Sequence, residues 1–140
     1  KECNGYKPDY VLLLQPTSPF REIQEIIGGM KKILQTNANT LISVTSMKEH
    51  PYECIDANRK DWRYIEKNNS SVPGRQEYQE KFYFIDGNFY LIKTDFLLKE
   101  KILIEEGHTE LYPLERAWPV DIDTPEDILL AEAFIDANNE

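Results

Sequence analysis

Cysteine, long apolar runs and basic residues are all scarce in this sequence, and each scarcity argues against a class of protein. The 140 residues include only two cysteines, Cys3 and Cys54, too few for a disulfide framework or a paired-cysteine metal site. We therefore expect a reduced, cytoplasmic setting. No apolar run approaches the roughly 18 residues that a membrane span requires, so we expect no membrane association.

Negative charge predominates in the chain. Lys and Arg total 16 and Asp and Glu total 25, which gives a formal net charge of −9. Nucleic acids and anionic membranes carry the same sign, so we expect neither as a partner. A glycine-rich phosphate-binding loop is also missing, because Gly28 and Gly29 lie within a helical pattern and no Lys-Ser or Lys-Thr pair follows them.

The length and the 41% hydrophobic content predict one compact domain over residues 1–140 with a substantial core. Because the chain starts at Lys1 without an initiator Met, we expect it to be an internal part of a longer protein.

A βαβ unit is predicted over residues 10–46. The apolar run Tyr10–Leu14 is typical of a strand buried on both faces. Two prolines prevent regular structure in Gln15–Arg21, and apolar residues then recur at helical spacing from Ile23 to Leu34. Gly28 and Gly29 within that helix indicate a close approach to the sheet. Thr40–Ser46 is rich in strand formers, so the fold class is α/β.

The rest of the chain is less regular. Residues 47–80 form a long polar excursion that carries a hairpin, with weak strands at 52–55 and 63–65. Asp86-Gly87 separates two strand-like segments and predicts either a hairpin or a bulge. We expect a helix over 94–99 and short strands over 102–104 and 111–114. Thr124-Pro125 begins a final helix toward Asn138.

Asp121 and Asp123 follow Val120 in an extended segment that immediately precedes this helix. Residues two apart in a strand project to one face, and two convergent carboxylates suit a hard cation such as Mg²⁺. The alternative is that Asp123 only helps to start the helix and that Asp121 is solvated.

Gln15 and Arg21 flank the proline-rich bend at the end of the first strand, where α/β folds place their ligands. A carboxamide and a guanidinium could bind a carboxylate or sugar hydroxyls. The alternative is a stiff turn in which Thr17 and Ser18 satisfy backbone groups.

Four segments together resemble the acylneuraminate cytidylyltransferases, the synthetases of CMP-sialic acid and related CMP-nonulosonic acids. The segments are Asp9–Arg21, with its L-Q-P-T-S-P-x-R string, Gly74–Gln76, Asp86–Tyr90 and Val120–Thr124. The resemblance covers nearly the whole chain and corresponds to the C-terminal part of that family. It implies transfer of CMP from CTP to the anomeric hydroxyl of a nonulosonic acid, with release of pyrophosphate.

The resemblance also implies an architecture and a set of site residues. The fold would be a three-layer α/β/α Rossmann-like nucleotidyltransferase, working as a homodimer through the 47–80 excursion. Asp121 and Asp123 would hold Mg²⁺, and Asp123 would help to remove the proton of the attacking hydroxyl. The residues expected to bind the sugar substrate are Gln15, Arg21, Arg75, Gln76 and Tyr90.

Three departures from the family pattern affect these expectations. The family's N-terminal loop for the CTP phosphates is missing, so we expect this chain alone to be inactive. Glu53 stands where a lysine that reaches the sugar carboxylate is common. Asp86 replaces the usual Asn, and aliphatic Leu103 and Ile104 replace an aromatic pair, which favours a sugar other than N-acetylneuraminic acid.

Two other interpretations stay open at this point. The chain could derive from another CTP-dependent nucleotidyltransferase for a sugar acid. It could also be a non-catalytic, dimerising remnant.

Overall fold

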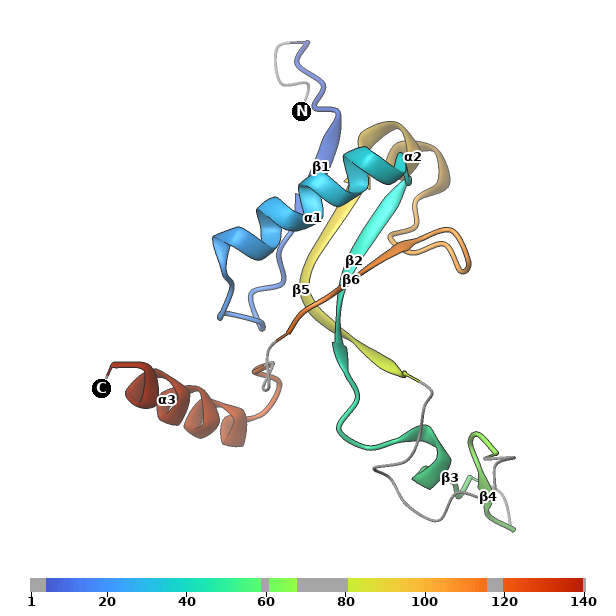
Figure 1. Ribbon diagram of the computed structural model, residues 1–140, viewed down its shortest axis with the longest axis vertical. Helices are drawn as coiled ribbons and strands as arrows, with labels where there is room; N and C mark the ends of the chain where they lie inside the picture. The colour runs from blue at the N-terminus through green and yellow to red at the C-terminus, as the bar shows by residue number, and fades with distance from the viewer. Residues whose placement is uncertain (1–4, 59–60, 68–80, 116–119, 140) are drawn as a thin grey trace. The chain divides into compact units, whose positions relative to one another are not determined.

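A computed structural model describes residues 5–58, 61–67, 81–115 and 120–139 as a mixed α/β structure (Figure 1). The chain divides into two units. One unit comprises the chain up to Thr45 together with the chain from Ile85 onward, and it carries the main sheet. The other unit comprises Ser46–Phe84 and carries a small hairpin.

The main sheet has four strands in the order β1-β5-β2-β6, namely β1 (Tyr10–Leu13), β5 (Tyr83–Lys93), β2 (Thr40–Ser46) and β6 (Glu110–Pro113). β1 pairs with β5 in antiparallel register, and β2 pairs with β6 in parallel register. The Lys93 N–H donates to the Asn39 carbonyl at 2.8 Å, and the Phe89 N–H donates to Ser43 Oγ at 3.0 Å, so β5 also runs antiparallel to β2. β1 and β2 are therefore parallel, as the βαβ pattern predicts, but β5 lies between them (Figure 1).

β1 corrects one expectation. The apolar run at Tyr10–Leu14 predicted a strand buried on both faces, yet Leu12, Leu13 and Leu14 are 36–41% exposed. Within the described part of the chain, β1 is an edge strand that pairs only with β5. The strands that are buried on both faces are the central ones, β2 and β5. An apolar run cannot by itself show whether a strand lies at the centre or the edge of a sheet.

The helix α1 (Ile23–Thr36) follows the predicted periodicity and ends at Asn37, whose φ of 53° is left-handed. It packs on the sheet through a core of Ile33, Leu41, Phe89, Leu91 and Leu114. The predicted close approach is present, because a Cβ atom added at Gly29 would lie 2.7 Å from the Phe89 ring. The glycine lets the helix axis approach the strand below it.

The Asp86-Gly87 pair lies within the strand β5. The hairpin alternative is wrong, because one strand runs without interruption through the pair. Gly87 has a φ of 70°, a left-handed conformation that breaks the regular pleat without reversing the chain. The expected strand at 102–104 is also wrong, since these residues have no regular structure. They pair with no strand, and local β propensity is weak without a partner.

Two further helices agree with the sequence patterns. α2 (Thr94–Glu100) follows β5, and α3 (Pro125–Asn139) begins at the predicted proline. Within the described residues, no helix is long and apolar enough to cross a bilayer.

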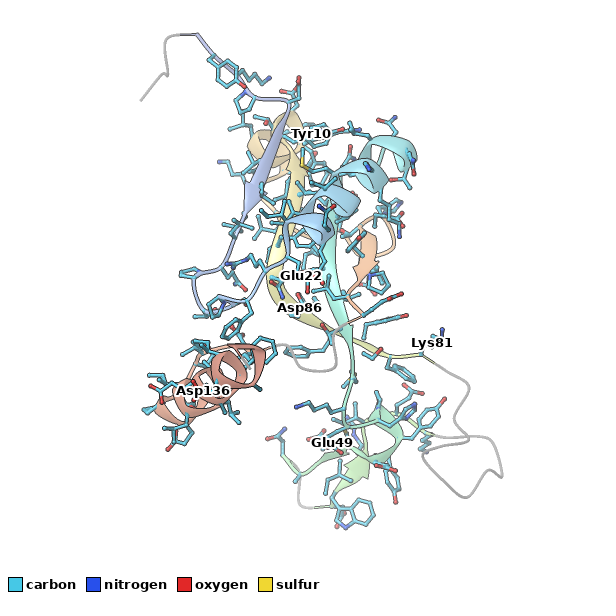
Figure 2. All side chains as sticks on the ribbon, turned by 60° about the vertical axis from the view of Figure 1, so that its left-hand side comes forward. Tyr10, Glu22, Glu49, Lys81, Asp86 and Asp136 are labelled. Carbon is cyan, nitrogen blue, oxygen red and sulfur yellow. The ribbon has the colours of Figure 1, made fainter. Side chains whose placement is uncertain are left out.

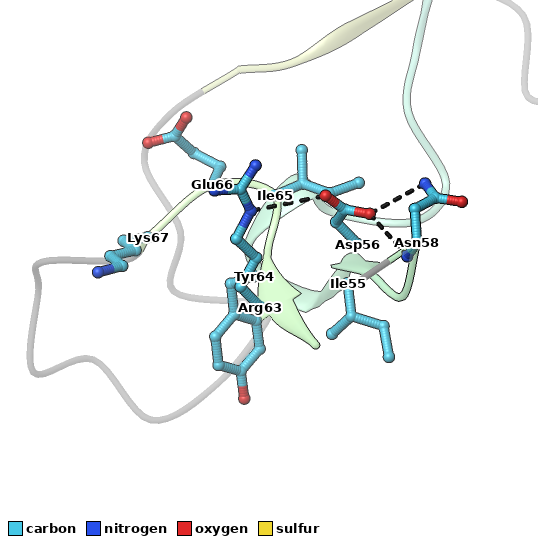
Figure 3. A pocket seen from close by; sticks show the side chains of 8 residues that line it. All are labelled: Ile55, Asp56, Asn58, Arg63, Tyr64, Ile65, Glu66 and Lys67. Carbon is cyan, nitrogen blue, oxygen red and sulfur yellow. Dashed lines mark hydrogen bonds and ion pairs between the residues drawn. The ribbon is translucent and has the colours of Figure 1, made fainter. Parts of the chain in front are cut away.

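The second unit contains the 3₁₀ turn η1 (Pro51–Glu53) and the antiparallel hairpin of β3 (Ile55–Asp56) and β4 (Arg63–Tyr64). An open hollow lies on this hairpin, where Arg63 Nε and Asp56 Oδ2 are 3.5 Å apart (Figure 3). The hairpin predicted within the 47–80 excursion is thus present. Residues 68–80 of that excursion lie outside the described residues.

Candidate functional site

The bend at Gln15–Arg21 is fixed against β5 by its own terminal residues. The Ser18 N–H donates to the Gln15 carbonyl at 3.2 Å, which closes a turn. Arg21 Nη2 donates to the same carbonyl, and Arg21 Nε donates to the Asn88 carbonyl at 2.7 Å. Arg21 therefore braces the bend through backbone oxygens, which supports the stiff-turn alternative for this residue.

The acidic segment near the C-terminus meets this bend. The Ile122 N–H donates to the Thr17 carbonyl at 2.8 Å, and Ser18 Oγ donates to Asp121 Oδ1 at 3.2 Å. Ser18 is buried, with 2% exposure, and Asp121 is half-buried. Two segments about a hundred residues apart in sequence therefore share one short stretch of contacts.

Tyr90 lies on β5 in the same neighbourhood and is only 8% exposed. Burial raises the pKa of its phenol, and the negative charges of Asp86 and then Asp121 raise that pKa further. The phenol is accordingly a neutral hydrogen-bonding group at physiological pH. Tyr90 pairs with Leu13 of β1 and lies two residues after Asn88, whose carbonyl accepts from Arg21, so the backbone places the tyrosine beside the Gln15–Arg21 bend.

Gln15 reaches β5 as well. Its side-chain oxygen lies so close to Gly87 that a Cβ atom at that position would overlap it. The structure thus brings four of the predicted site residues together, namely Gln15, Arg21, Tyr90 and Asp121. Arg75 and Gln76 lie outside the described residues.

Asp123 is exposed, and its carboxylate has no hydrogen-bond or ion-pair partner among the described residues. The start of α3 is instead organised by Asp127, which accepts hydrogen bonds from the Thr124 N–H at 2.7 Å, the Thr124 hydroxyl at 2.9 Å and the Asp123 N–H at 3.1 Å. These bonds lower the pKa of Asp127. Asp127, rather than Asp123, therefore fixes the two residues that precede the helix, as the acid at the third helical position of a capping box does.

Asp86 lies on β5 (Figure 2), and the sequence analysis noted it only as a departure from the family pattern, without its hydrogen bonds. Its carboxylate is buried, with 2% exposure, and accepts hydrogen bonds from Ser43 Oγ at 2.5 Å, Thr45 Oγ1 at 2.7 Å and the Asn88 N–H at 2.9 Å. A weak signal was present in the sequence. Ser43 and Thr45 are two apart in an apolar strand, so both hydroxyls face the same side and require a buried polar partner.

The donor set fits a divalent cation only in part. Asp121 and Asp123 carry carboxylate oxygens, the ligand type that Mg²⁺ prefers, and neither forms an ion pair with a described residue. The described residues contain no group of three or more His, Cys, Asp or Glu side chains arranged to hold a metal ion. Two carboxylates alone suit an ion that also takes ligands from a bound phosphate group.

No family model matches this chain. Two curated proteins are similar to it at low identity. One is CMP-N,N'-diacetyllegionaminic acid synthase of Legionella pneumophila, 28% identical over 139 residues, covering 94% of this chain and 56% of the relative. The other is post-translational flagellin modification protein B of Campylobacter coli, 24% identical over 132 residues, covering 94% of this chain and 54% of the relative.

The chain therefore spans about half the length of the curated relatives that it matches. The resemblance indicated by the sequence motifs is confirmed as distant homology: the chain is a distant relative of CMP-N,N'-diacetyllegionaminic acid synthase.

Proposed function

We propose that the protein containing this chain is a Mg²⁺-dependent cytidylyltransferase that transfers CMP from CTP to the anomeric hydroxyl of a nonulosonic acid and releases pyrophosphate. The observation that carries the proposal is the meeting of the Gln15–Arg21 bend with Asp121, through the bonds from Ser18 to Asp121 and from Ile122 to Thr17. Distant homology to a CMP-legionaminic acid synthase supports the same chemistry.

Each residue has a definite part in this proposal. The Gln15 carboxamide offers both a donor and an acceptor to sugar hydroxyls. The neutral Tyr90 phenol offers a hydrogen bond from a largely buried position. Asp123, the more exposed acid, accepts the proton of the attacking anomeric hydroxyl. Mg²⁺ held by Asp121 and Asp123 would neutralise charge on the nucleotide phosphates.

The proposed substrate is a nonulosonic acid other than N-acetylneuraminic acid. Asp86, Leu103 and Ile104 depart from the pattern of the sialic acid synthetases, and one relative is named for diacetyllegionaminic acid. The half-exposed Leu103 and Ile104 side chains present an aliphatic surface. We also propose a three-layer α/β/α fold, a homodimer and a cytoplasmic location for the whole protein, and we propose that this chain alone is inactive.

The test is turnover by the full-length protein with CTP, Mg²⁺ and a panel of acid sugars. The panel contains N-acetylneuraminic acid, N,N'-diacetyllegionaminic acid, pseudaminic acid and 3-deoxy-manno-octulosonic acid, and pyrophosphate release is measured. We expect the highest kcat/KM with one of the two diacetamido acids. Preference for N-acetylneuraminic acid would refute the substrate assignment, and no turnover with any nonulosonic acid would refute the function.

A further inference from the structure

Asp86 is buried without a cationic partner among the described residues. Its two carboxylate oxygens are satisfied by neutral donors alone, which come from β2 and from its own strand. Burying a carboxylate is costly even when it is hydrogen-bonded, so its presence requires an explanation beyond packing.

The local geometry shows what the carboxylate holds. The Asn88 N–H donates back to Asp86 Oδ1 at 2.9 Å, which closes a turn around the left-handed Gly87. The hydroxyls of Ser43 and Thr45 fasten that turn to the neighbouring strand. The Asp86 carboxylate therefore fixes the one irregular point in β5.

The Gln15–Arg21 bend contacts β5 at this irregular point around Gly87. Ser18 Oγ lies 3.2 Å from the Asp86 carbonyl oxygen, and Arg21 Nε donates to the Asn88 carbonyl at 2.7 Å. Between these two anchors the Gln15 side chain rests directly on Gly87, where only a hydrogen atom fits. A small change in the turn would consequently move the Gln15 carboxamide.

We infer that Asp86 is a positioning residue: by holding the turn at Gly87 it sets the place of the Gln15 carboxamide, and so the affinity for the acid sugar. This inference rests on the proposed function. Misplacement of a binding group by about 1 Å costs up to about a hundredfold in rate, so the effect is measurable.

The test uses the full-length protein, with KM measured separately for the preferred acid sugar and for CTP. We expect Asp86→Ala to raise the KM for the sugar at least about tenfold and to change the KM for CTP less than about threefold. Asp86→Asn keeps the acceptor for the Asn88 N–H and should restore most of the sugar affinity. The exposed acid Asp136 on α3 provides the control, Asp136→Ala (Figure 2).

Because Asp86→Ala removes the acceptor of three hydrogen bonds and could unfold the protein, Gly87→Ala is the second variant. Its Cβ atom should displace Gln15, so it should also raise the KM for the sugar. In a protein that already carries Gln15→Ala, neither Asp86→Ala nor Gly87→Ala should raise the KM for the sugar further. The inference would be overturned if each substitution raised this KM equally with and without Gln15→Ala. It would also be overturned if the KM values for sugar and CTP rose equally.

Melting temperatures of the same variants give a readout that needs no substrate. Gly87→Ala should lower the melting temperature less when Gln15 is already Ala, because its Cβ atom no longer overlaps the Gln15 side chain and only the backbone strain remains. An equal decrease in melting temperature with and without Gln15→Ala would overturn the inference even if turnover supports the function. If no acid sugar is turned over, the proposed function fails, and the melting-temperature cycle still decides whether Gln15 depends on this turn.

Discussion

Ser18 donates its side-chain hydroxyl to Asp121 Oδ1 at 3.2 Å, and the same oxygen atom lies 3.2 Å from the carbonyl of Asp86. One small, buried side chain thus stands between the acidic segment before α3 and the irregular turn in β5. The Ile122 N–H reinforces the junction by donating to the neighbouring Thr17 carbonyl at 2.8 Å. Asp121, the proposed metal ligand, and the Gln15–Arg21 bend, the proposed substrate-binding segment, are consequently one structural unit. A substitution in either should affect the position of the other.

Removing the charge of either proposed metal ligand should abolish activity. We expect Asp121→Asn and Asp123→Asn each to lower kcat by at least about a hundredfold in the full-length protein, because charge on the phosphates would then be poorly neutralised. The Mg²⁺ concentration for half-maximal rate should rise. Asp136→Asn, an exposed acid on α3, is the control. Unchanged Mg²⁺ dependence in both variants would contradict the proposed metal site.

Tyr90 should make the protein sensitive to alkaline pH. Its pKa is raised in the folded state, first by burial and then by Asp86 and Asp121, while the unfolded chain has the ordinary value of about 10. The folded state therefore binds the proton more tightly, and stability falls as pH rises from that value through the folded pKa. Tyr90→Phe should lose less free energy of unfolding, measured by urea unfolding, as the pH rises above about 10. Parallel pH profiles for the two proteins would contradict the shift.

Asp127 should have the opposite effect at acid pH. Its pKa is lowered by the hydrogen bonds from the Thr124 N–H, the Thr124 hydroxyl and the Asp123 N–H. The stability that it contributes is present above the unfolded value of about 3.9 and is lost as pH falls through the folded pKa. Asp127→Ala should reduce the loss of stability at acid pH, measured as unfolding with falling pH by circular dichroism. Glu126→Ala, in the same helical turn, should leave that loss unchanged.

The paired glycines of α1 should respond differently to alanine. At Gly29 a Cβ atom meets the Phe89 ring within the core, and overpacking costs about 1–3 kcal/mol, more than the gain of about 1 kcal/mol in helix propensity. At Gly28 the Cβ atom would lie 2.1 Å from the oxygen of Tyr112 and 3.0 Å from the adjoining ring carbon, so the outer end of this half-buried side chain would have to shift. We expect both substitutions to lower the melting temperature, and Gly29→Ala to lower it more, because its clash lies within the core. A larger loss at Gly28 would contradict this assignment.

Much of the local structure was predictable because it depends on residues that are neighbours in the sequence. The periodicity of Ile23–Leu34 predicted α1, and the Thr124-Pro125 pair predicted the start of α3 at the correct residue. Gly28 and Gly29 indicated the close packing of helix and sheet that the structure contains. The motifs around Gln15 and Asp121 also predicted a relation to the CMP-nonulosonic acid synthetases, and the distant homology confirms it.

The sequence by itself determined the helices, the strands at Tyr10–Leu13 and Thr40–Ser46 and the proline-fixed bend, since each depends on residues within a few positions of one another. Only the tertiary structure decided that β1 is an edge strand among the described residues, that β5 continues through Asp86-Gly87 without reversing the chain, and that Asp86 is buried. Each of these depends on which strand lies alongside, and pairing partners are set by contacts between distant parts of the chain. The clearest case is Asp86: the Asp86-Gly87 pair predicted a hairpin or a bulge, whereas burial of the carboxylate depends on the hydroxyl groups that Ser43 and Thr45 of β2 donate to it.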